Sequence, residues 1–523
     1  MYSSKRLYHM KKIIMLFVIN TIYGYVFCQT VSTTKELYRP SYHFTPSAHW
    51  MNDPNGLVYY AGEYHLFYQY YPKASVWGPM HWGHAVSKDL FHWKHLPIAL
   101  YPDSLGYIFS GSAVIDHDNT SGLGTKINPP MVAIFAYHNP KLEKSGSNQY
   151  QYQGMAYSLD KGRTWKKYNH NPVVPNVEKL RDFRDPKVLW DVQIKKWILT
   201  LAAGDEVEFY SSSNLIDWKK ESGFGKNIGA HGGVWECPDM FPMVVKNTGE
   251  KKWVLLVSIN PGGPNGGSAT QYFVGNFDGN QFTPDDMQTR WLDYGKDNYA
   301  GVTWSDIPSV DGRRLFLGWM SNWQYGTQVP TEKWRSSMTT PRELTLVKSG
   351  TGYILASNPV REIAKIQTRS VVIQPQTIHN NVDITKSVPF RLSKTELILN
   401  LKIGEQSPAK FGIKLSNDLN ESLIAGYDIT TGQLFVDRTQ SGKVGFSKDF
   451  PAIVTAPCKL DNNTLQLHIL LDEASIEIFA QQGKTVLTNI FFPSQPYSKL
   501  SLFSEAGTVQ ATEIKLWELE KAM

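Results

Sequence analysis

The sequence has little cysteine, little net charge and no long apolar run beyond its N-terminus. Only Cys28, Cys237 and Cys458 occur among 523 residues, too few and too far apart for a disulfide framework or a cysteine metal site. The formal net charge is +6, and four of the cations lie within residues 1–28, which contain no acid. The rest of the chain therefore carries +2, which gives no support to binding of nucleic acid or of an anionic membrane.

The N-terminus has the pattern of an export signal. Lys11 and Lys12 precede Ile13–Phe27, a mostly apolar segment that is too short and too polar for a membrane span. We predict a signal peptide over residues 1–28 and an exported chain, either secreted, periplasmic or bound to the cell surface. An uncleaved anchor or a lipid-modified Cys28 is the alternative. No later segment approaches about 18 uninterrupted apolar residues, so no membrane span is expected in the mature chain.

Short aromatic and β-branched runs, broken by Gly, Asn, Asp and Pro, fill the chain from about residue 42 to 346, without a long helical period. A degenerate turn motif recurs between them. It occupies Ser87–Trp93, Ser158–Trp165, Ser213–Trp218 and Asn276–Phe282. Its last aromatic residues are 72, 53 and 64 positions apart, which suits one four-stranded sheet per repeat. We predict an all-β fold in which residues 40–350 form a five-bladed β-propeller; an array of β-sandwiches is the alternative.

The remainder of the chain predicts a connector and a second β domain. Residues 351–370 include Pro359–Gln367, whose amphipathic pattern indicates a helical linker. Strand patterns then resume at Thr395–Ile403, Thr464–Leu471, Ser475–Ala480 and Lys499–Ser504. Their alternation predicts an antiparallel β-sandwich over residues 371–523. No low-complexity tract or charge run separates the two parts, so we expect them to be docked against each other.

Three carboxylates lie in proline-containing motifs of successive repeats. They are Asp53 in Trp50–Gly56, Asp185 in Phe183–Pro186 and Glu236 in Gly233–Asp239. Each motif alone is typical of a turn or a surface ion pair. Together the three motifs are a strong indication of a catalytic site, because carboxylates from successive blades can converge on the axis of a propeller. Glycoside cleavage needs one acid to protonate the leaving oxygen and a second carboxylate to attack or to activate water.

Further motifs follow in a specific order along the chain. They are Tyr64–Tyr70, Trp82–Ser87, Phe109–Ser112, Gly318–Trp323 and Trp334–Leu344. With the three acid motifs, they make the sequence resemble glycoside hydrolase family 32, the family of invertases, inulinases and levanases, over nearly the whole mature chain. The resemblance implies a five-bladed propeller followed by a C-terminal β-sandwich, in agreement with the repeat pattern.

The resemblance also implies residue roles. Asp53 is the nucleophile that attacks the anomeric carbon of a β-fructofuranosyl unit, and Glu236 is the acid and then the base. Asp185 stabilises the transition state, with Arg184 keeping it ionised. The implied mechanism is retaining, so the carboxyl groups of Asp53 and Glu236 should lie about 5–5.5 Å apart. The implied substrate-binding residues are Asn52, Gln69, Trp77, Phe109, Ser110, Arg184 and Trp323.

We therefore expect an exo-acting fructan β-fructosidase that releases terminal fructose from inulin or levan and also cuts sucrose. The exo preference rests on resemblance around Ala136–Pro140 and Met155–Trp165 and on an expected pocket. The alternatives are a sucrose-specific invertase, an endo-levanase or endo-inulinase, a fructosyltransferase, an inverting arabinan-cleaving propeller and a non-catalytic carbohydrate-binding protein. No cofactor and no metal ion are expected, because the histidines at 65, 81, 84, 92 and 95 lack a metal-ligand spacing.

Overall fold

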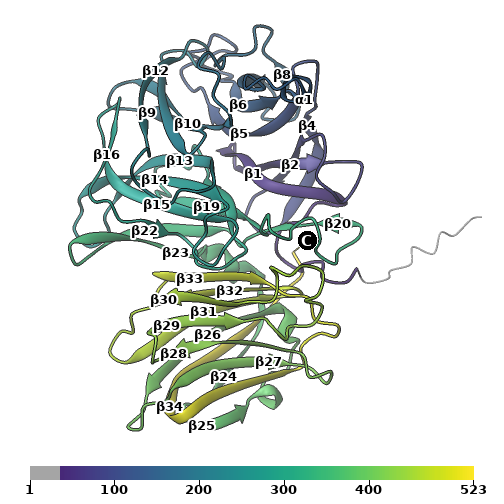
Figure 1. Ribbon diagram of the computed structural model, residues 1–523, viewed down its shortest axis with the longest axis vertical. Coiled ribbons are helices and arrows are strands. Elements are labelled where there is room, and N and C mark those ends of the chain that lie inside the picture. The colour runs from purple at the N-terminus through teal and green to yellow at the C-terminus, as the bar shows by residue number, and fades with distance from the viewer. Residues whose placement is uncertain (1–35, 523) are drawn as a thin grey trace, which may run out of the picture. The chain divides into compact units, whose positions relative to one another are not determined.

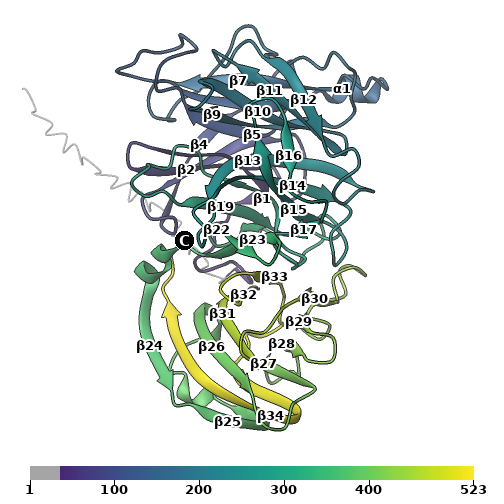
Figure 2. The same cartoon turned by 90° about the vertical axis from the view of Figure 1, so that its left-hand side faces the viewer.

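β-Strands make up most of residues 36–522, the part of the chain that the computed structural model describes (Figure 1; Figure 2). The predicted signal peptide over residues 1–28, with Cys28, lies outside the described residues. Between residues 36 and 522, no helix is long and apolar enough to cross a membrane. Cys237 and Cys458 are both buried and free.

Five antiparallel sheets follow one another along the first part of the chain, which confirms the five-bladed propeller. Blade one contains β1 (His49–Tyr60), β2 (Glu63–Tyr71), β3 (His81–Ser87) and β4 (Trp93–Leu100). Blade two contains β5 (Tyr107–Ile115), β6 (Met131–His138), β7 (Gln151–Ser158) and β8 (Lys166–Lys167). Blade three contains β9 (Phe183–Asp191), β10 (Lys196–Ala203), β11 (Glu206–Ser212) and β12 (Lys219–Phe224).

The last two blades carry extra short strands. Blade four contains β13 (Val234–Val244), β14 (Lys251–Asn260), β15 (Ala269–Phe277) and β16 (Phe282–Pro284), with β17 (Arg290–Trp291) beside β15. Blade five contains β18 (Tyr299–Thr303), β19 (Arg314–Met320), β22 (Arg342–Ser349) and β23 (Gly352–Pro359), with β21 (Ser337–Met338) beside β19. The ring is closed by β20 (Trp334–Arg335), which lies between β19 and β22 in sequence and pairs in parallel with β1.

The recurring turn motif lies between strands, as predicted, and the structure shows that it joins the third and fourth strands of a blade. In blade one the Ser87 hydroxyl accepts the N–H of Leu90 at 2.9 Å, and the Trp93 indole donates to the Leu90 carbonyl at 2.9 Å. The same indole bond closes the turns of blades two and three. In blade three, however, the turn serine is Ser212 rather than the predicted Ser213. Residues 211–213 are three consecutive serines, so the sequence alone did not fix which one enters the turn.

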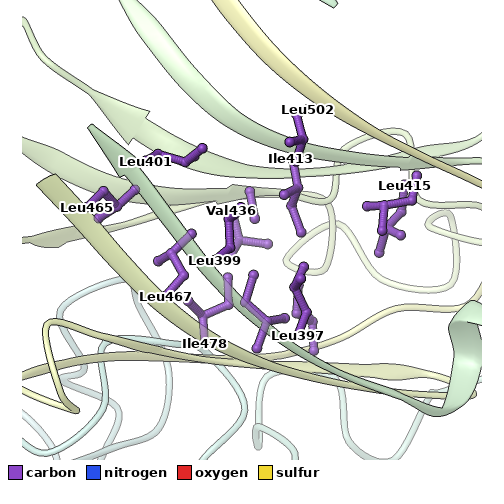
Figure 3. Close-up of a cluster of buried hydrophobic side chains, with 14 of the residues drawn as sticks. Leu397, Leu399, Leu401, Ile413, Leu415, Val436, Leu465, Leu467, Ile478 and Leu502 are labelled. Atoms are coloured by element: carbon purple, nitrogen blue, oxygen red, sulfur yellow. The ribbon is translucent and has the colours of Figure 1, made fainter. Parts of the chain in front are cut away.

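The C-terminal part is an 11-stranded antiparallel sheet built on one long strand, β34 (Lys499–Leu519). The first half of β34 pairs with β27 (Lys410–Ser416), and its second half pairs with β26 (Thr395–Ile403) and β24 (Gln367–Ile373). The other strands are β25 (Gln376–Asp383), β28 (Ser422–Asp428), β29 (Gln433–Asp437), β30 (Ile453–Pro457), β31 (Thr464–Asp472), β32 (Ser475–Ala480) and β33 (Thr485–Ile490). Alternate apolar side chains of these strands form one buried cluster, which confirms the predicted sandwich (Figure 3).

The connector between the two parts is mostly extended. Only Arg361–Ile366 is helical within residues 351–370, and it is a 3-10 helix. The residues before it form β23 of blade five, and those after it form β24 of the sandwich. Ile363 and Ile366 are both buried, and a spacing of three residues suits the tighter 3-10 turn.

Buried ion pairs join the propeller to the sandwich, as expected for docked domains. Arg342 of β22 donates to Asp293 at 2.8 Å and to Glu477 of β32 at 2.5 Å. His43 lies between Asp472 and Glu477, at 2.8 Å from each. All five side chains are almost fully buried. Removing one member of such a group leaves its partners charged and unpaired in a medium of low polarity, which is strongly destabilising.

Replacing His43 should change how stability depends on pH. Burial alone would lower the pKa of His43, but its hydrogen bonds to Asp472 and Glu477 raise the pKa to about 9. Because this exceeds the value near 6.5 in an unfolded chain, the contribution is fully present below about pH 6.5 and is lost as pH rises through 9. The difference corresponds to about 3 kcal/mol of unfolding free energy.

We expect His43→Gln to lower the unfolding free energy at pH 6 and to flatten its decline between pH 6.5 and 9.5, measured by urea unfolding. His170→Gln is the matched control, because His170 is exposed. An unchanged pH profile in His43→Gln would contradict this account of the interface.

Candidate active site

A two-for-one bulge interrupts the first strand of every blade. Two consecutive residues of that strand lie opposite a single residue of the second strand. The bulged residues are Asn52 and Asp53 in β1, Phe109 and Ser110 in β5, Asp185 and Pro186 in β9, Cys237 and Pro238 in β13, and Ala300 and Gly301 in β18. Three of these bulges begin at a positive φ, 63° at Asp185, 47° at Cys237 and 53° at Ala300. Bulges of this kind re-aim side chains, and they are frequent beside active sites.

The structure brings all ten predicted site residues to one cavity of about 450 Å³. These residues are Asn52, Asp53, Gln69, Trp77, Phe109, Ser110, Arg184, Asp185, Glu236 and Trp323. Most of them lie in a bulge, beside one, or opposite one on the neighbouring strand. The bulges are therefore the local feature that gathers residues from all parts of the propeller sequence at one place.

Asp53 is surrounded by neutral hydrogen-bond donors. The Asn52 amide donates to one carboxylate oxygen at 2.9 Å, and the Ser110 hydroxyl donates to the other at 2.7 Å. The thiol of Cys237 lies 3.8 Å from the second oxygen. Burial and the nearby charge of Glu236 raise the pKa of Asp53, while the bonds from Ser110 and Asn52 oppose that rise. Asp53 is thus held in position without a cation in contact.

Asp185 is more deeply embedded. One of its oxygens accepts the backbone N–H of Cys237 at 3.1 Å and lies 3.6 Å from the Cys237 thiol. Burial raises the pKa of Asp185 to about 7, because the charges of Glu236 and Asp53 add to the effect and Arg184 only partly opposes it. Arg184 lowers the pKa of Asp185, which is the direction that the sequence predicts, but it does not offset the effect of burial. The reason is geometric, since the Arg184 Nε lies 3.9 Å from the Asp185 carboxylate.

Arg184 is instead bound mainly to two other carboxylates. Its guanidinium donates to Asp182 at 2.6 Å and to Glu236 at 3.0 Å, with a longer bond of 3.4 Å to the Gln151 side chain. The second oxygen of Glu236 accepts a hydrogen bond from the Tyr299 hydroxyl. Burial raises the pKa of Tyr299 well above its usual value, so this hydroxyl stays protonated and donates. Glu236 is therefore held between a cation and a phenol.

Aromatic rings form much of the remaining lining. Trp323 stacks on Trp50, with ring centroids 5.9 Å apart and an interplanar angle of 27°. Trp77 is 41% exposed and packs edge-to-face against Phe109, with ring centroids 6.1 Å apart. Ring faces of this kind pack against the C–H surface of a sugar, while amides and hydroxyls bind its oxygens.

Sequence reasoning missed several residues of the cavity and of its supports. The additional lining residues are His138, Glu143, Tyr150, Gln151, Arg181 and Asp182. The only signal among them was the resemblance around Ala136–Pro140, which contains His138. The other segment quoted for the exo preference, Met155–Trp165, does not line the cavity. Tyr299 was also missed, because nothing in its local sequence marks it as a partner of Glu236.

The described residues include no group of three or more His, Cys, Asp or Glu side chains arranged to hold a metal ion. Of the five histidines that occur close together in sequence, His65 and His84 do meet, at 3.1 Å, and both are buried. Burial lowers the pKa of both, so they are neutral near pH 7.

Comparisons with known proteins agree with this geometry. Residues 43–359 match the glycosyl hydrolases family 32 N-terminal domain, and residues 362–518 match the family 32 C terminal domain. A levanase from Bacillus subtilis (strain 168) is 48% identical over 495 residues, which cover 93% of this chain and 71% of that protein. An extracellular exo-inulinase from Aspergillus awamori is 37% identical over 512 residues, which cover 92% of this chain and 94% of that protein.

The fold agrees as well. The crystal structure of an exo-inulinase from Aspergillus awamori superimposes with a TM-score of 0.85 at 35% sequence identity, over 94% of this chain and 99% of that chain. Both the propeller and the sandwich are therefore shared with a solved relative. Because the two family matches together span residues 43–518 almost without a gap, this chain belongs to glycosyl hydrolase family 32.

Proposed function

We propose that this chain is a retaining, exo-acting β-fructofuranosidase that releases terminal fructose from inulin or levan and also hydrolyses sucrose. The observation that carries the proposal is the single cavity in which Asp53, Asp185 and Glu236 meet in three different environments. The similarity to a levanase and to an exo-inulinase supports fructans as the substrate class. Export is part of the proposal, supported by the pattern of residues 1–28 and by the relative named as extracellular.

The two reacting carboxylates differ in a way that suits a double displacement. Asp53, free of a contacting cation, attacks the anomeric carbon when ionised, and the bond to the leaving oxygen breaks. The proton of Glu236 passes to that oxygen, so the leaving sugar departs neutral. Glu236 then takes a proton from water, whose oxygen attacks the same carbon and releases Asp53. Arg184 and Tyr299 hold Glu236 in position through both steps.

Asp185 acts on the fructosyl unit rather than on the broken bond. Its carboxylate is fixed by the backbone N–H of Cys237, which leaves the other oxygen to accept sugar hydroxyls. Hydrogen bonds of this kind, when they strengthen as the ring gains positive charge, lower the barrier. Asn52 and Gln69 add amide groups to the lining of the same cavity, each oriented by a hydrogen bond to a neighbouring side chain.

The residues that line the cavity favour cleavage at the end of a fructan polymer. Residues from all five blade sequences surround the cavity, and Trp77, Phe109 and Trp323 add ring faces to its wall. A volume of about 450 Å³ lies in the usual range of small-molecule sites. A polymer enters such a pocket by its end, which favours exo cleavage over internal cleavage.

The test of the proposed function is a time course of products from inulin, levan and sucrose, resolved by anion-exchange chromatography. We expect fructose as the only early product from the fructans, and β-anomeric fructose as the first form seen by NMR. Early oligosaccharides would instead establish an endo enzyme, and cleavage of sucrose alone an invertase. An α-anomer would contradict Asp53 as the nucleophile, and no product from any substrate would favour a sugar-binding protein.

Replacing either reacting carboxylate should abolish turnover without unfolding the protein. We expect Asp53→Asn and Glu236→Gln each to lower kcat/KM for inulin by at least about a thousandfold, because each removes a group that acts only in the transition state. Circular dichroism and thermal unfolding should show a folded chain. Asp205→Asn is the matched control, since this carboxylate is exposed and lies outside the cavity. Near-normal activity in either variant would remove its assigned role.

The pH profile should report the coupling among the three carboxylates. Because Glu236 raises the pKa of both Asp53 and Asp185, the variant Glu236→Gln should lower both. An ionised carboxylate would then persist at lower pH, so the acidic limb of kcat/KM should move to lower pH by on the order of one unit. The measurement uses an aryl β-fructofuranoside, whose leaving group needs no acid. An unshifted limb, as expected for Asp205→Asn, would show that the carboxylates titrate independently.

A further inference from the structure

The outer face of the sandwich carries a hollow of about 660 Å³. Its lining comes from five strands, β25, β27, β28, β29 and β34, which all belong to the C-terminal sheet. None of the lining residues belongs to the candidate active site, which lies in the propeller. The hollow is therefore a separate surface, and none of the roles assigned above uses it.

The alternation of side chains along the strands directs the lining away from the core. In β27, Phe411, Ile413 and Leu415 belong to the buried cluster of the sandwich, whereas Lys410 and Lys414 are exposed and line the hollow. Successive side chains of a strand point to opposite faces of the sheet, so one face of β27 forms core and the other forms the hollow. The neighbouring strands β28 and β29 repeat this alternation.

Two aromatic rings border a row without side chains. Phe503 of β34 lies opposite Gly412 of β27. On the other side of Gly412 lies Gly426 of β28, which in turn lies opposite Phe435 of β29. The two phenylalanines thus stand three strand spacings apart, about 14 Å, and the missing side chains between them account for the hollow. Both rings are mostly buried, so they are fixed in place, and they offer apolar surface to the C–H face of a sugar.

The polar groups of the lining are uncommitted and their charges balance. Within the described part of the chain, the side chains of Asn381, Lys414 and Glu505 are exposed and have no hydrogen-bond or ion-pair partner. The charged lining residues are Lys410, Lys414, Asp437 and Glu505, so the net charge of the lining is zero. A charged polymer gains little from such a surface, whereas a neutral chain rich in hydroxyl groups can bond to amide, ammonium and carboxylate alike.

We propose that this hollow binds internal units of the fructan polymer. The proposal rests on the proposed function for the identity of the ligand, a neutral, hydroxyl-rich β-fructan chain. Phe435 and Phe503 supply apolar surface, and Asn381, Lys414 and Glu505 supply hydrogen bonds. A polymer held on the sandwich stays close to the protein, so its ends reach the candidate active site at a higher effective concentration. Sucrose has no further units to bind and gains nothing from the hollow.

The first test measures binding without turnover. The whole protein, in a Glu236→Gln background that should not cleave, is run in native gels that contain levan or inulin, with excess methyl β-D-fructofuranoside to fill the active site. We expect the added pair Asn381→Ala and Lys414→Ala to weaken binding of the polymer by about fivefold, because two hydrogen-bonding groups are lost. The pair Gln374→Ala and Lys402→Ala is the matched control, since both residues are exposed on the sandwich outside the hollow.

Turnover gives a second readout, which a merely structural role would not move. With Glu236 intact, the Asn381→Ala and Lys414→Ala pair should raise KM about threefold for the polymer that the unaltered protein cleaves faster, with kcat and the kinetics on sucrose unchanged. An equal loss on sucrose, or unchanged binding and unchanged KM for the polymer, would overturn the proposal and leave the proposed function intact.

Light scattering after size exclusion tests the other occupant, a second copy of this chain. If the same pair of substitutions changes the oligomeric state and leaves polymer binding unaltered, the face is an interface between copies and the proposal is overturned. Failure of the unaltered protein to cleave any fructan would instead overturn the proposed function. The gel measurement would still decide whether the hollow binds the polymer, because it needs no turnover.

Discussion

The bulge in the first strand of each blade is the constraint on which the site depends. Because the bulge falls near the start of the first strand in every blade, residues in and beside the bulges become neighbours at one end of the propeller. Arg184, Glu236 and Tyr299 each directly precede a bulge, and they form a continuous hydrogen-bonded row across blades three to five. Asp53 and Ser110 are each the second bulged residue, and they bond to each other across blades one and two.

That geometry concentrates negative charge, and the protein compensates for it only partly. Five carboxylates line the cavity with Arg181 and Arg184, and the closest contacts of Arg184 are to Glu236 and Asp182. Asp185 accepts the backbone N–H of Cys237, and burial raises its pKa, which favours the protonated form of this carboxyl. In the proposed function, a sugar hydroxyl that donates to Asp185 offsets the cost of burying this carboxylate, and so adds to the affinity for the substrate.

The sequence predicted the structure correctly where a local pattern of residues determines a local backbone geometry. The proline after Asp53 and the proline two residues after Glu236 mark backbone breaks, and the strand runs gave the blades and much of the sandwich correctly. It was uninformative where a contact depends on how blades pack. Tyr299 and Glu236 meet across two blades, each directly before the bulge of its own strand, and Glu143 reaches the cavity from a five-residue helix with no motif of its own. The predicted turn serine was wrong by one position, Ser213 instead of Ser212, because three consecutive serines do not show which of them begins the turn.

The closure of the ring connects the packing of the sandwich to the candidate active site. β20 pairs with the start of β1, and Trp50 at that seam donates its indole N–H to Asn52 at 2.7 Å. Asn52 in turn donates to Asp53, so the orientation of the proposed nucleophile depends on how well the seam is held. Leu470 and Phe479 of the sandwich pack in the same buried cluster as Trp50. The sandwich therefore contributes apolar packing directly at the seam where the ring closes. Its packing supports the seam, which two hydrogen bonds connect to Asp53, the carboxylate proposed as the nucleophile.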